Sequence, residues 1–364
     1  MGLKAGIVGL PNVGKSCLFN ALTKKMVESS NYAFTTIDPN ISTVTLEDKR
    51  LDKLAEIVKP DKIVYATFDF VDIAGLVKGA SKGEGLGNKF LSNIKEVNAI
   101  VHVVRCFENK DILHVNNKID PVYDVQTINE ELILADISAL ESMIAKINKK
   151  AKSGDKEAQE EYNLFLKIKS LLESGNLIYD DKELMANEDL FKKYQFLTAK
   201  PMIYVANIDA KSLDNIEANP FVASLKKYLG SKPLLPICIL TENEISQVND
   251  DEKVEFMEMY NLQDTSLNKL TRITFDILGL KTYFTAGKME VRAWVYKDGM
   301  LAPECAGIIH SDFQNKFIKA GVISYEDYVK FEGELGAKNA GKLRLEGKNY
   351  IMNDGDICHF RFGK

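Results

Sequence analysis

The sequence predicts an α/β protein with a doubly wound, mostly parallel sheet, an inserted helical hairpin and a small β-rich module at the C-terminal end. Three patterns indicate this fold class. Apolar runs alternate with helical patterns over residues 1–127 and 200–280, a heptad stripe lies within 128–199, and half-exposed strands alternate through 281–364. We therefore expect three domains with these boundaries, the first of them formed by two separate stretches of chain.

Short apolar and β-branched runs are the candidate strands of the sheet. They are Ala5–Gly9, Val64–Val71, Ala99–Val104, Met202–Asn207 and Leu234–Leu240. One helical pattern begins at Lys15 and another covers Ser266–Leu278, so helices separate the strands. This alternation favours parallel pairing, with helices covering both faces of the sheet.

The stretch 128–199 has the pattern of an antiparallel helical hairpin. Its heptad stripe consists of Ile133, Ile137, Leu140, Ile144 and Ile147. A polar turn at Lys149–Glu157 follows, and then a second amphipathic stretch that ends at Ser174-Gly175. The turn and the returning helix favour a hairpin within one chain over a coiled coil between two chains. A third helix is expected over Asp181–Thr198.

The composition narrows the class of protein. Of the 364 residues, 45% are hydrophobic and 27% charged, the balance of a soluble globular protein. No apolar run approaches the roughly 18 residues of a membrane helix, and no signal-peptide pattern begins the chain, so we expect a cytoplasmic protein without membrane contact. Five widely spaced cysteines without a CxxC pair argue against a disulfide framework or a zinc site. The net charge of −5 gives no sign of general nucleic-acid binding.

Residues Gly9–Ser16 read GLPNVGKS and match the phosphate-binding pattern G-x-x-x-x-G-K-[ST], after a strand and before a helix. The two glycines let the backbone wrap a phosphate chain, and N–H groups of the loop and of the helix start bind the anion. Lys15 adds a charge for the β- and γ-phosphates, and Ser16 offers its hydroxyl to Mg²⁺. The nucleotide-binding residues expected here are Asn12, Val13, Gly14, Lys15, Ser16 and Cys17.

Three later residues, in this order along the chain, indicate a nucleotide-dependent switch. Thr36 is the candidate loop threonine that closes on the metal, Asp72 can hold Mg²⁺ through water, and Gly75 can turn its N–H toward a γ-phosphate. The glycine-rich segment 76–87 suits a loop that orders and disorders with the γ-phosphate. We therefore predict Mg²⁺ as cofactor, held by Ser16, Thr36 and Asp72.

The catalytic group is not the usual one. Leu76 stands where related switches place a water-orienting glutamine, and its side chain can neither donate nor accept a hydrogen bond. Catalysis then needs another polar group. His114 is the candidate catalytic residue, together with Lys15.

The base site is expected after the strand Met202–Asn207, where guanine-specific proteins carry Asn-Lys-x-Asp. This chain has Asn207-Ile208-Asp209-Ala210, so the carboxylate that accepts two hydrogen bonds from guanine is missing. Asn207 and Ile208 are the candidate base contacts. Asp209, one position away, could partly replace the lost carboxylate, but ATP is the expected nucleotide.

Together these motifs resemble the YchF/Obg-like ATPase family of translation-factor-class P-loop proteins. The resemblance extends over essentially the whole chain and includes, besides the phosphate loop, the segments NYAFTTIDPN, VDIAGLVKGASKGEGLGN, RCFENKDILHVNNKIDP and GKNYIMNDGDICHFRF. It implies a P-loop G domain at 1–127 and 200–280, a helical insertion and a C-terminal TGS domain with a β-grasp fold. It also implies hydrolysis of ATP in preference to GTP, with a histidine of the HVN loop, here His114, in the catalytic role.

The resemblance has further implications for partners and ions. It implies association with ribosomes, a link to translation and stress responses, and RNA held in a cleft between the helical and TGS domains. Asn12 matches an asparagine that coordinates K⁺ in related switches, which makes K⁺ a further candidate cofactor. Ala210 departs from the family, which usually has glutamate there, so adenine preference depends on Asn207 and on backbone contacts. The chain is expected to act as a monomer.

Two other functions remain open. One is a nucleotide-controlled RNA- or ribosome-binding module in which hydrolysis is incidental, because basic residues with interleaved aromatic ones suit single-stranded RNA. The residues concerned are Lys316, Lys319, Lys338, Lys342, Arg344 and Lys348, with Phe313, Phe317, Tyr325 and Tyr350. The other is an Obg-type GTPase, which Ala210 disfavours.

Overall fold

The computed structural model describes residues 3–28, 40–73, 86–112, 118–187, 191, 193–248, 257 and 264–363. The chain divides into two compact units. One comprises residues 1–43 with 69–267, and the other comprises residues 44–68 with 268–364. Neither unit is therefore a single continuous stretch of the sequence.

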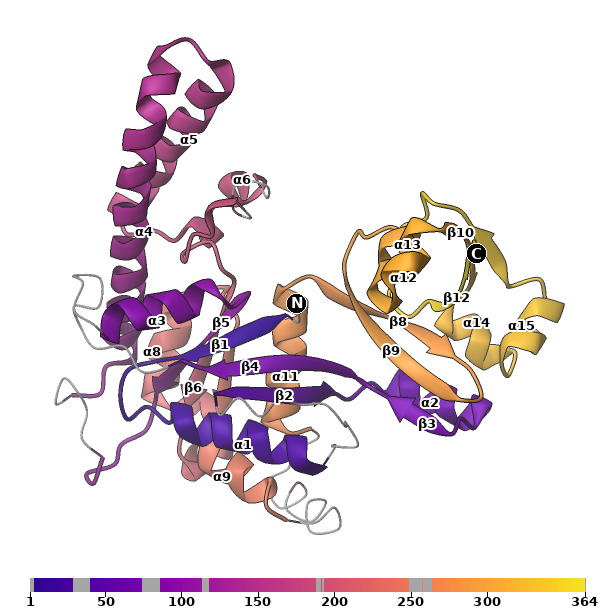
Figure 1. The fold of residues 1–364 in the computed structure, drawn as a ribbon. Helices are drawn as coiled ribbons and strands as arrows, with labels where there is room; N and C mark the ends of the chain where they lie inside the picture. The colour runs from indigo at the N-terminus through magenta and orange to yellow at the C-terminus, as the bar shows by residue number, and fades with distance from the viewer. Residues whose placement is uncertain are drawn as a thin grey trace. The chain divides into compact units, whose positions relative to one another are not determined.

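The first unit is built on a six-stranded sheet in the order β2-β4-β1-β5-β6-β7 (Figure 1). The strands are β1 (Lys4–Val8), β2 (Ile41–Leu46), β4 (Ala66–Asp72), β5 (Ala99–Arg105), β6 (Met202–Asn207) and β7 (Leu234–Ile237). The pairs β1–β4, β1–β5, β5–β6 and β6–β7 are all parallel. Every residue of β5 and β6 is buried, as expected for parallel strands covered on both faces. The predicted mostly parallel, doubly wound sheet is confirmed.

Helices cover this sheet. They include α1 (Lys15–Glu28), α3 (Leu86–Lys95), α8 (Pro220–Leu229) and α9 (Ile239–Ile245). α1 and α9 lie side by side (Figure 1). Asn219 begins α8 by accepting the N–H groups of Phe221 and Val222 on its side-chain oxygen, a strong helix-start signal. The strand expected over Leu234–Leu240 is shorter than predicted, because α9 already begins at Ile239.

A helical hairpin is inserted between β5 and β6. α4 (Pro121–Lys152) and α5 (Lys156–Glu173) run side by side (Figure 1), and Lys169 Nζ lies 2.8 Å from Glu141 Oε1 across them. Leu140 of the predicted stripe is fully buried, as is Ile168 of the returning helix. The predicted hairpin within one chain is confirmed. Among the described helices, none is both long enough and apolar enough to cross a membrane.

The helix predicted over Asp181–Thr198 is only partly correct. In the described residues, α6 (Lys182–Met185) is a single turn, Phe191, Lys193 and Tyr194 are helical again, and the chain is no longer helical at Phe196. The early end is explained by the buried carboxylate of Asp136 on α4. It accepts hydrogen bonds from the N–H groups of Leu197 (2.9 Å) and Thr198 (2.8 Å) and from the Thr198 hydroxyl (2.7 Å). These N–H groups are thus committed to a side chain rather than to helical carbonyls.

The second unit contains a six-stranded sheet in the order β11-β10-β12-β8-β9-β3. Its strands are β3 (Lys62–Val64), β8 (Leu280–Ala286), β9 (Glu290–Lys297), β10 (Phe317–Ile323), β11 (Arg344–Glu346) and β12 (Ile357–Phe362). β8–β9, β10–β11 and β10–β12 pair antiparallel, and β12 pairs parallel with β8 in the middle of the sheet. This is the expected β-grasp arrangement. The single strand predicted over Val64–Val71 is in fact two strands, because β3 pairs with β9 whereas β4 belongs to the first sheet.

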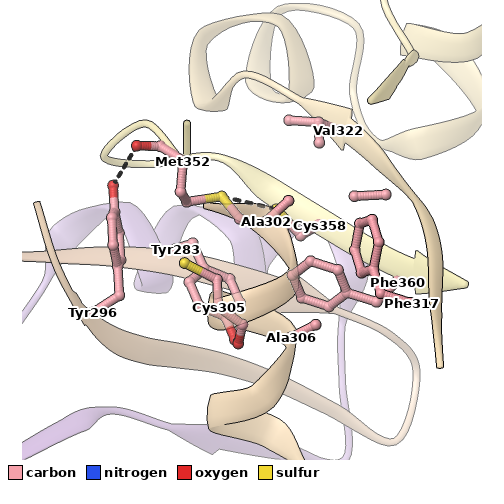
Figure 2. Packing of buried hydrophobic residues seen from close by; sticks show 11 residues of the cluster. Tyr283, Tyr296, Ala302, Cys305, Ala306, Phe317, Val322, Met352, Cys358 and Phe360 are labelled. Carbon is pink, nitrogen blue, oxygen red and sulfur yellow. Dashed lines mark hydrogen bonds between the residues drawn. The ribbon is translucent and has the colours of Figure 1, made fainter. Parts of the chain in front are cut away.

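Helices pack on the sheet of the second unit and enclose two apolar clusters. The helices are α2 (Lys49–Val58), α12 (Ala302–Ile309), α13 (Ser311–Asn315), α14 (Tyr325–Lys330) and α15 (Glu334–Asn339). A further helix, α11 (Ser266–Ile277), begins two residues before the boundary between the units. Figure 2 shows one cluster, in which Tyr296 donates to the Met352 carbonyl and Cys358 Sγ lies 3.5 Å from Met352 Sδ. Leu51 and Leu54 of α2 belong to the other cluster.

Arg50 attaches α2 further to this unit. Its guanidinium lies 2.9 Å from the carboxylate of Asp354 and donates to the hydroxyl of Thr282, also at 2.9 Å. Residues 44–68 are therefore an integral part of the C-terminal fold.

Candidate functional site

The phosphate loop connects β1 to α1 in a conformation that needs its glycines. Asn12 and Gly14 have left-handed backbone angles, with φ of 63° and 101°. A Cβ on Gly9 would lie 2.5 Å from the Val103 carbonyl oxygen, and a Cβ on Gly14 would lie 2.5 Å from Asn207 Nδ2. Neither position can therefore take a larger residue without moving the backbone or Asn207.

Lys15 is the buried cation of the loop. Its side chain is 9% exposed, and its Nζ donates to the Leu10 carbonyl at 2.9 Å. Burial lowers the pKa of Lys15, and the nearby carboxylate of Asp72 opposes that change. Burial likewise raises the pKa of Asp72, which Lys15 opposes. The predicted phosphate-binding cation and the predicted metal-binding carboxylate thus lie close enough to influence each other.

A cavity of about 660 Å³ opens beside the loop. Its walls come from four segments: residues 12–17, Phe107–Ile112, Asn207–Ala210 and Cys238–Glu244. These segments follow β1, β5, β6 and β7, so the cavity lies at the carboxyl ends of the parallel strands, where ligands of α/β sheets bind. The volume is that of a small-molecule site.

Most of the predicted nucleotide-binding residues meet in this cavity. Asn12, Gly14, Lys15, Ser16, Cys17, Asn207 and Ile208 line it. Val13 is buried behind the loop surface, at 1% exposure. Thr36, Gly75 and His114 lie outside the described residues, so their roles stay predictions.

Asn207 links the phosphate loop to the base side of the cavity. Its Nδ2 donates to the Val13 carbonyl at 2.9 Å, and its Oδ1 accepts the N–H of Ile239 at 3.4 Å. Both ends of the amide are thus engaged with backbone. Asn207 fixes the loop relative to β6 and α9, and the base contact expected of it stays a prediction.

Asp209 is also engaged within the protein. It begins a short 3-10 helix (Ala210–Leu213), and its Oδ1 accepts from Ser212 N at 3.0 Å and from Ser212 Oγ at 2.6 Å. Ala210 lines the cavity without any polar side-chain atom.

A metal site made of protein atoms alone is not present in the described residues, where no three His, Cys, Asp or Glu side chains cluster. Mg²⁺ in nucleotide sites does not need one, since it takes one or two protein oxygens together with phosphate oxygens and waters. Ser16 lines the cavity and Asp72 ends β4 close to Lys15, which fits that donor set.

Two buried residues near the site were not found by sequence reasoning. Arg105 ends β5, and His102 lies on the same strand, opposite Val8 of β1 and Tyr204 of β6. Within the described part of the chain, neither ring nitrogen of His102 has a hydrogen-bond partner. Burial, and to a lesser extent Lys15, lowers the pKa of His102 to about 3. The signal that could have found both is a basic residue inside an apolar strand.

His102 is expected to make the first unit sensitive to acid. Below pH 6.5 the unfolded chain binds a proton at this histidine and the folded chain does not, so stability falls as the pH drops toward 3. We expect His102→Phe to flatten that fall by up to about 1.4 kcal/mol per pH unit between pH 6 and 4. Urea unfolding followed by circular dichroism at several pH values measures this. The exposed His359→Phe is the control, and equal slopes for His102→Phe and the parent chain would contradict the prediction.

Comparisons with known proteins agree with this architecture. A model of YchF GTPase C-terminal domains, described as a protein of unknown function (DUF933), matches residues 280–363, and a model of 50S ribosome-binding GTPases matches residues 4–149. The chain is 53% identical to the ribosome-binding ATPase YchF of Haemophilus influenzae, covering 100% of this chain and 99% of the relative. It is 50% identical to the protein of the same name from Bacillus subtilis, with 100% of both chains covered.

Among solved structures, the YchF GTPase of Schizosaccharomyces pombe matches with a TM-score of 0.90 and 35% identity. That match covers 99% of this chain and 98% of the other. With relatives this similar over their full length and a matching fold throughout, the chain belongs to the YchF family.

Proposed function

We propose that this protein is a Mg²⁺-dependent nucleoside-triphosphate phosphohydrolase that prefers ATP to GTP, acts as a conformational switch, and associates with the ribosome to regulate translation or the response to stress. The ribosome and ATP are proposed because relatives of this chain are named ribosome-binding ATPases. The preference for ATP rests on one observation in the cavity: Asp209 is engaged in capping and Ala210 offers no hydrogen-bonding side chain. We place this activity in the cytoplasm and assign it to a monomer.

The residues of the cavity divide the chemistry between them. N–H groups at the start of α1 hold the phosphates, and Lys15 compensates the charge that develops on the γ-phosphate. Mg²⁺, when bound by Ser16, Thr36 and Asp72, neutralises phosphate charge. His114 orients the attacking water, which is the role that a glutamine has in related switches. The protein's contribution is positioning and charge stabilisation, so slow turnover is expected in the absence of a partner.

Guanine specificity requires a free carboxylate opposite the base edge. The described carboxylates that line the cavity are Glu108, Asp209 and Glu244. Glu108 and Glu244 are exposed, and the Oδ1 of Asp209 already accepts two hydrogen bonds from Ser212. A guanine therefore lacks the carboxylate that guanine-specific proteins have at the position of Ala210, whereas adenine can be held by backbone groups and apolar walls.

Paired calorimetric titrations of ATP and GTP, with Mg²⁺, test this proposal. We expect ATP to bind at least about tenfold more tightly than GTP. Ala210→Asp restores the missing carboxylate and is expected to tighten GTP binding by about tenfold, since a hydrogen bond to a charged group contributes about 1.5–3 kcal/mol. Ala210→Asn is the control of equal size without charge. Tighter binding of GTP by the parent chain would overturn the ATPase assignment, and equal binding would overturn the base preference.

A nucleotide-controlled RNA-binding module is the second candidate function. It is favoured by the exposed guanidinium of Arg344, which lies 5.5 Å from the ring centre of Tyr350, an arrangement on which a base can stack. Phe317 belongs instead to the core of the second unit, at 4% exposure, so it is not part of such a surface.

A further inference from the structure

Arg105 is one of the largest fully buried side chains of the protein. It is 1% exposed, at the carboxyl end of β5. Its Nε donates to the Phe107 carbonyl at 3.2 Å, one terminal nitrogen donates to the Ile112 carbonyl at 3.0 Å, and the other donates to the Asn109 carbonyl at 3.0 Å. The guanidinium also lies 4.8 Å from the ring centre of Phe107. A single buried cation therefore gathers three carbonyls of the loop 107–112.

This loop forms one wall of the cavity. Phe107, Glu108, Asn109 and Ile112 all line it. The phosphate-binding groups come from a different segment, residues 12–17, which Asn207 anchors from the other side. The loop 107–112 thus lines the cavity together with Asn207 and Ile208, the candidate base contacts, and is separate in sequence from the phosphate loop.

We infer that Arg105 is the positioning residue of the nucleoside-binding wall: it holds the loop 107–112 against the cavity, and the affinity for the base and ribose depends on it. This inference rests on the proposed function, because it concerns the same nucleotide site. The role of Arg105 follows from the free-energy cost of burying a charged group. A buried guanidinium must have its donors satisfied. If the loop moves away, the guanidinium loses three hydrogen-bond acceptors at once. The position of the loop 107–112 therefore depends on a residue of the buried strand β5.

Lysine cannot replace this arrangement. The three carbonyls are spread around a planar fork of donors, which the guanidinium matches and a single ammonium does not. Burial lowers the pKa of Arg105, and the nearby carboxylate of Asp124 only partly opposes that change, so the buried charge depends on the three carbonyls that accept its hydrogen bonds. Arg105→Lys keeps this charge and removes only the fork, which separates positioning from electrostatics.

Titration of two ligands tests the role of Arg105. MgATP is titrated directly, and inorganic tripolyphosphate with Mg²⁺ is measured by competition against ATP. We expect Arg105→Lys to weaken ATP binding by about tenfold and tripolyphosphate binding by less than about twofold, since only the nucleoside wall is loosened. Arg292→Lys is the matched control, because the Arg292 guanidinium also lies over a ring, 4.1 Å from the centre of Trp294, but in the second unit. It should leave both affinities unchanged.

The outcomes separate the inference about Arg105 from the proposed function. Unchanged ATP affinity in Arg105→Lys overturns the inference, and so does an equal loss for both ligands, which would indicate a general structural role. Failure of the parent chain to bind ATP overturns the proposed function instead. If Arg105→Lys does not fold, hydrogen exchange on the parent chain decides: ATP should protect the amides of 107–112 and tripolyphosphate should not, and equal protection by both overturns the inference.

Discussion

Replacing Lys15 by alanine is expected to lower nucleotide hydrolysis by roughly a hundredfold to a thousandfold, the range for loss of one group that stabilises charge in the transition state. The effect follows from the burial of Lys15 inside the loop, beside the predicted phosphate position. Among the described residues, its ammonium donates a hydrogen bond only to the Leu10 carbonyl. Phosphate release at saturating ATP, together with ATP affinity from calorimetry, measures it. We expect both quantities to fall.

His114→Ala separates an effect on hydrolysis from an effect on ATP binding. The proposed role of His114 concerns only the attacking water, so its loss should slow hydrolysis by about a hundredfold, within the range for one acid–base group, and leave ATP affinity nearly unchanged. Undiminished hydrolysis in Lys15→Ala would show that the cavity is not the catalytic site. If His114→Ala abolishes hydrolysis but preserves cellular function, the RNA-binding module becomes the better description.

Tyr283→Ala is expected to destabilise the second unit by about 3–5 kcal/mol, the usual result of removing a large aromatic ring from a core. Tyr283 is fully buried, its hydroxyl donates to the Cys305 carbonyl at 2.8 Å, and its ring packs beside Tyr296 and Phe360 (Figure 2). The chain has one tryptophan, Trp294, and it lies in this same unit. Its fluorescence during urea unfolding therefore reports on this unit within the full-length protein.

The control for this variant is Tyr283→Phe, which keeps the ring and removes the hydroxyl. It leaves the buried Cys305 carbonyl without that donor and should destabilise the unit by about 1–3 kcal/mol. A loss below about 1 kcal/mol in Tyr283→Ala would show that the cluster in Figure 2 is not the centre of the unit's stability.

Local patterns accounted for much of the fold. The phosphate loop, the buried strands β5 and β6 and the hairpin of α4 and α5 follow from signals that lie within a few residues of one another, namely glycine placement, unbroken apolar runs and a heptad period. Most of the predicted nucleotide-binding residues also line one cavity, because a parallel sheet brings the ends of its strands together.

What the sequence did not reveal depends on contacts between distant residues. No pattern near Lys62–Val64 announces that β3 pairs with β9, more than 200 residues later in the chain. The buried bond network of Asp136 ended a predicted helix from a distance. Arg105 and His102 look like ordinary strand residues until the structure shows that one binds three carbonyls and the other has unpartnered nitrogens in the described structure.

The position of α2 within the C-terminal fold has a consequence for biosynthesis. Leu51 and Leu54 share a core with Phe284 and Ile357, so their partners leave the ribosome more than 200 residues later. At about 5–20 residues per second, the apolar face of α2 waits roughly 15–60 s for them. During that interval the nascent chain carries a half-built core that is open to aggregation or to capture by a chaperone. For the same reason, a chain truncated before β12 would lose part of the packing around Leu51 and Leu54, which are synthesised about 300 residues earlier.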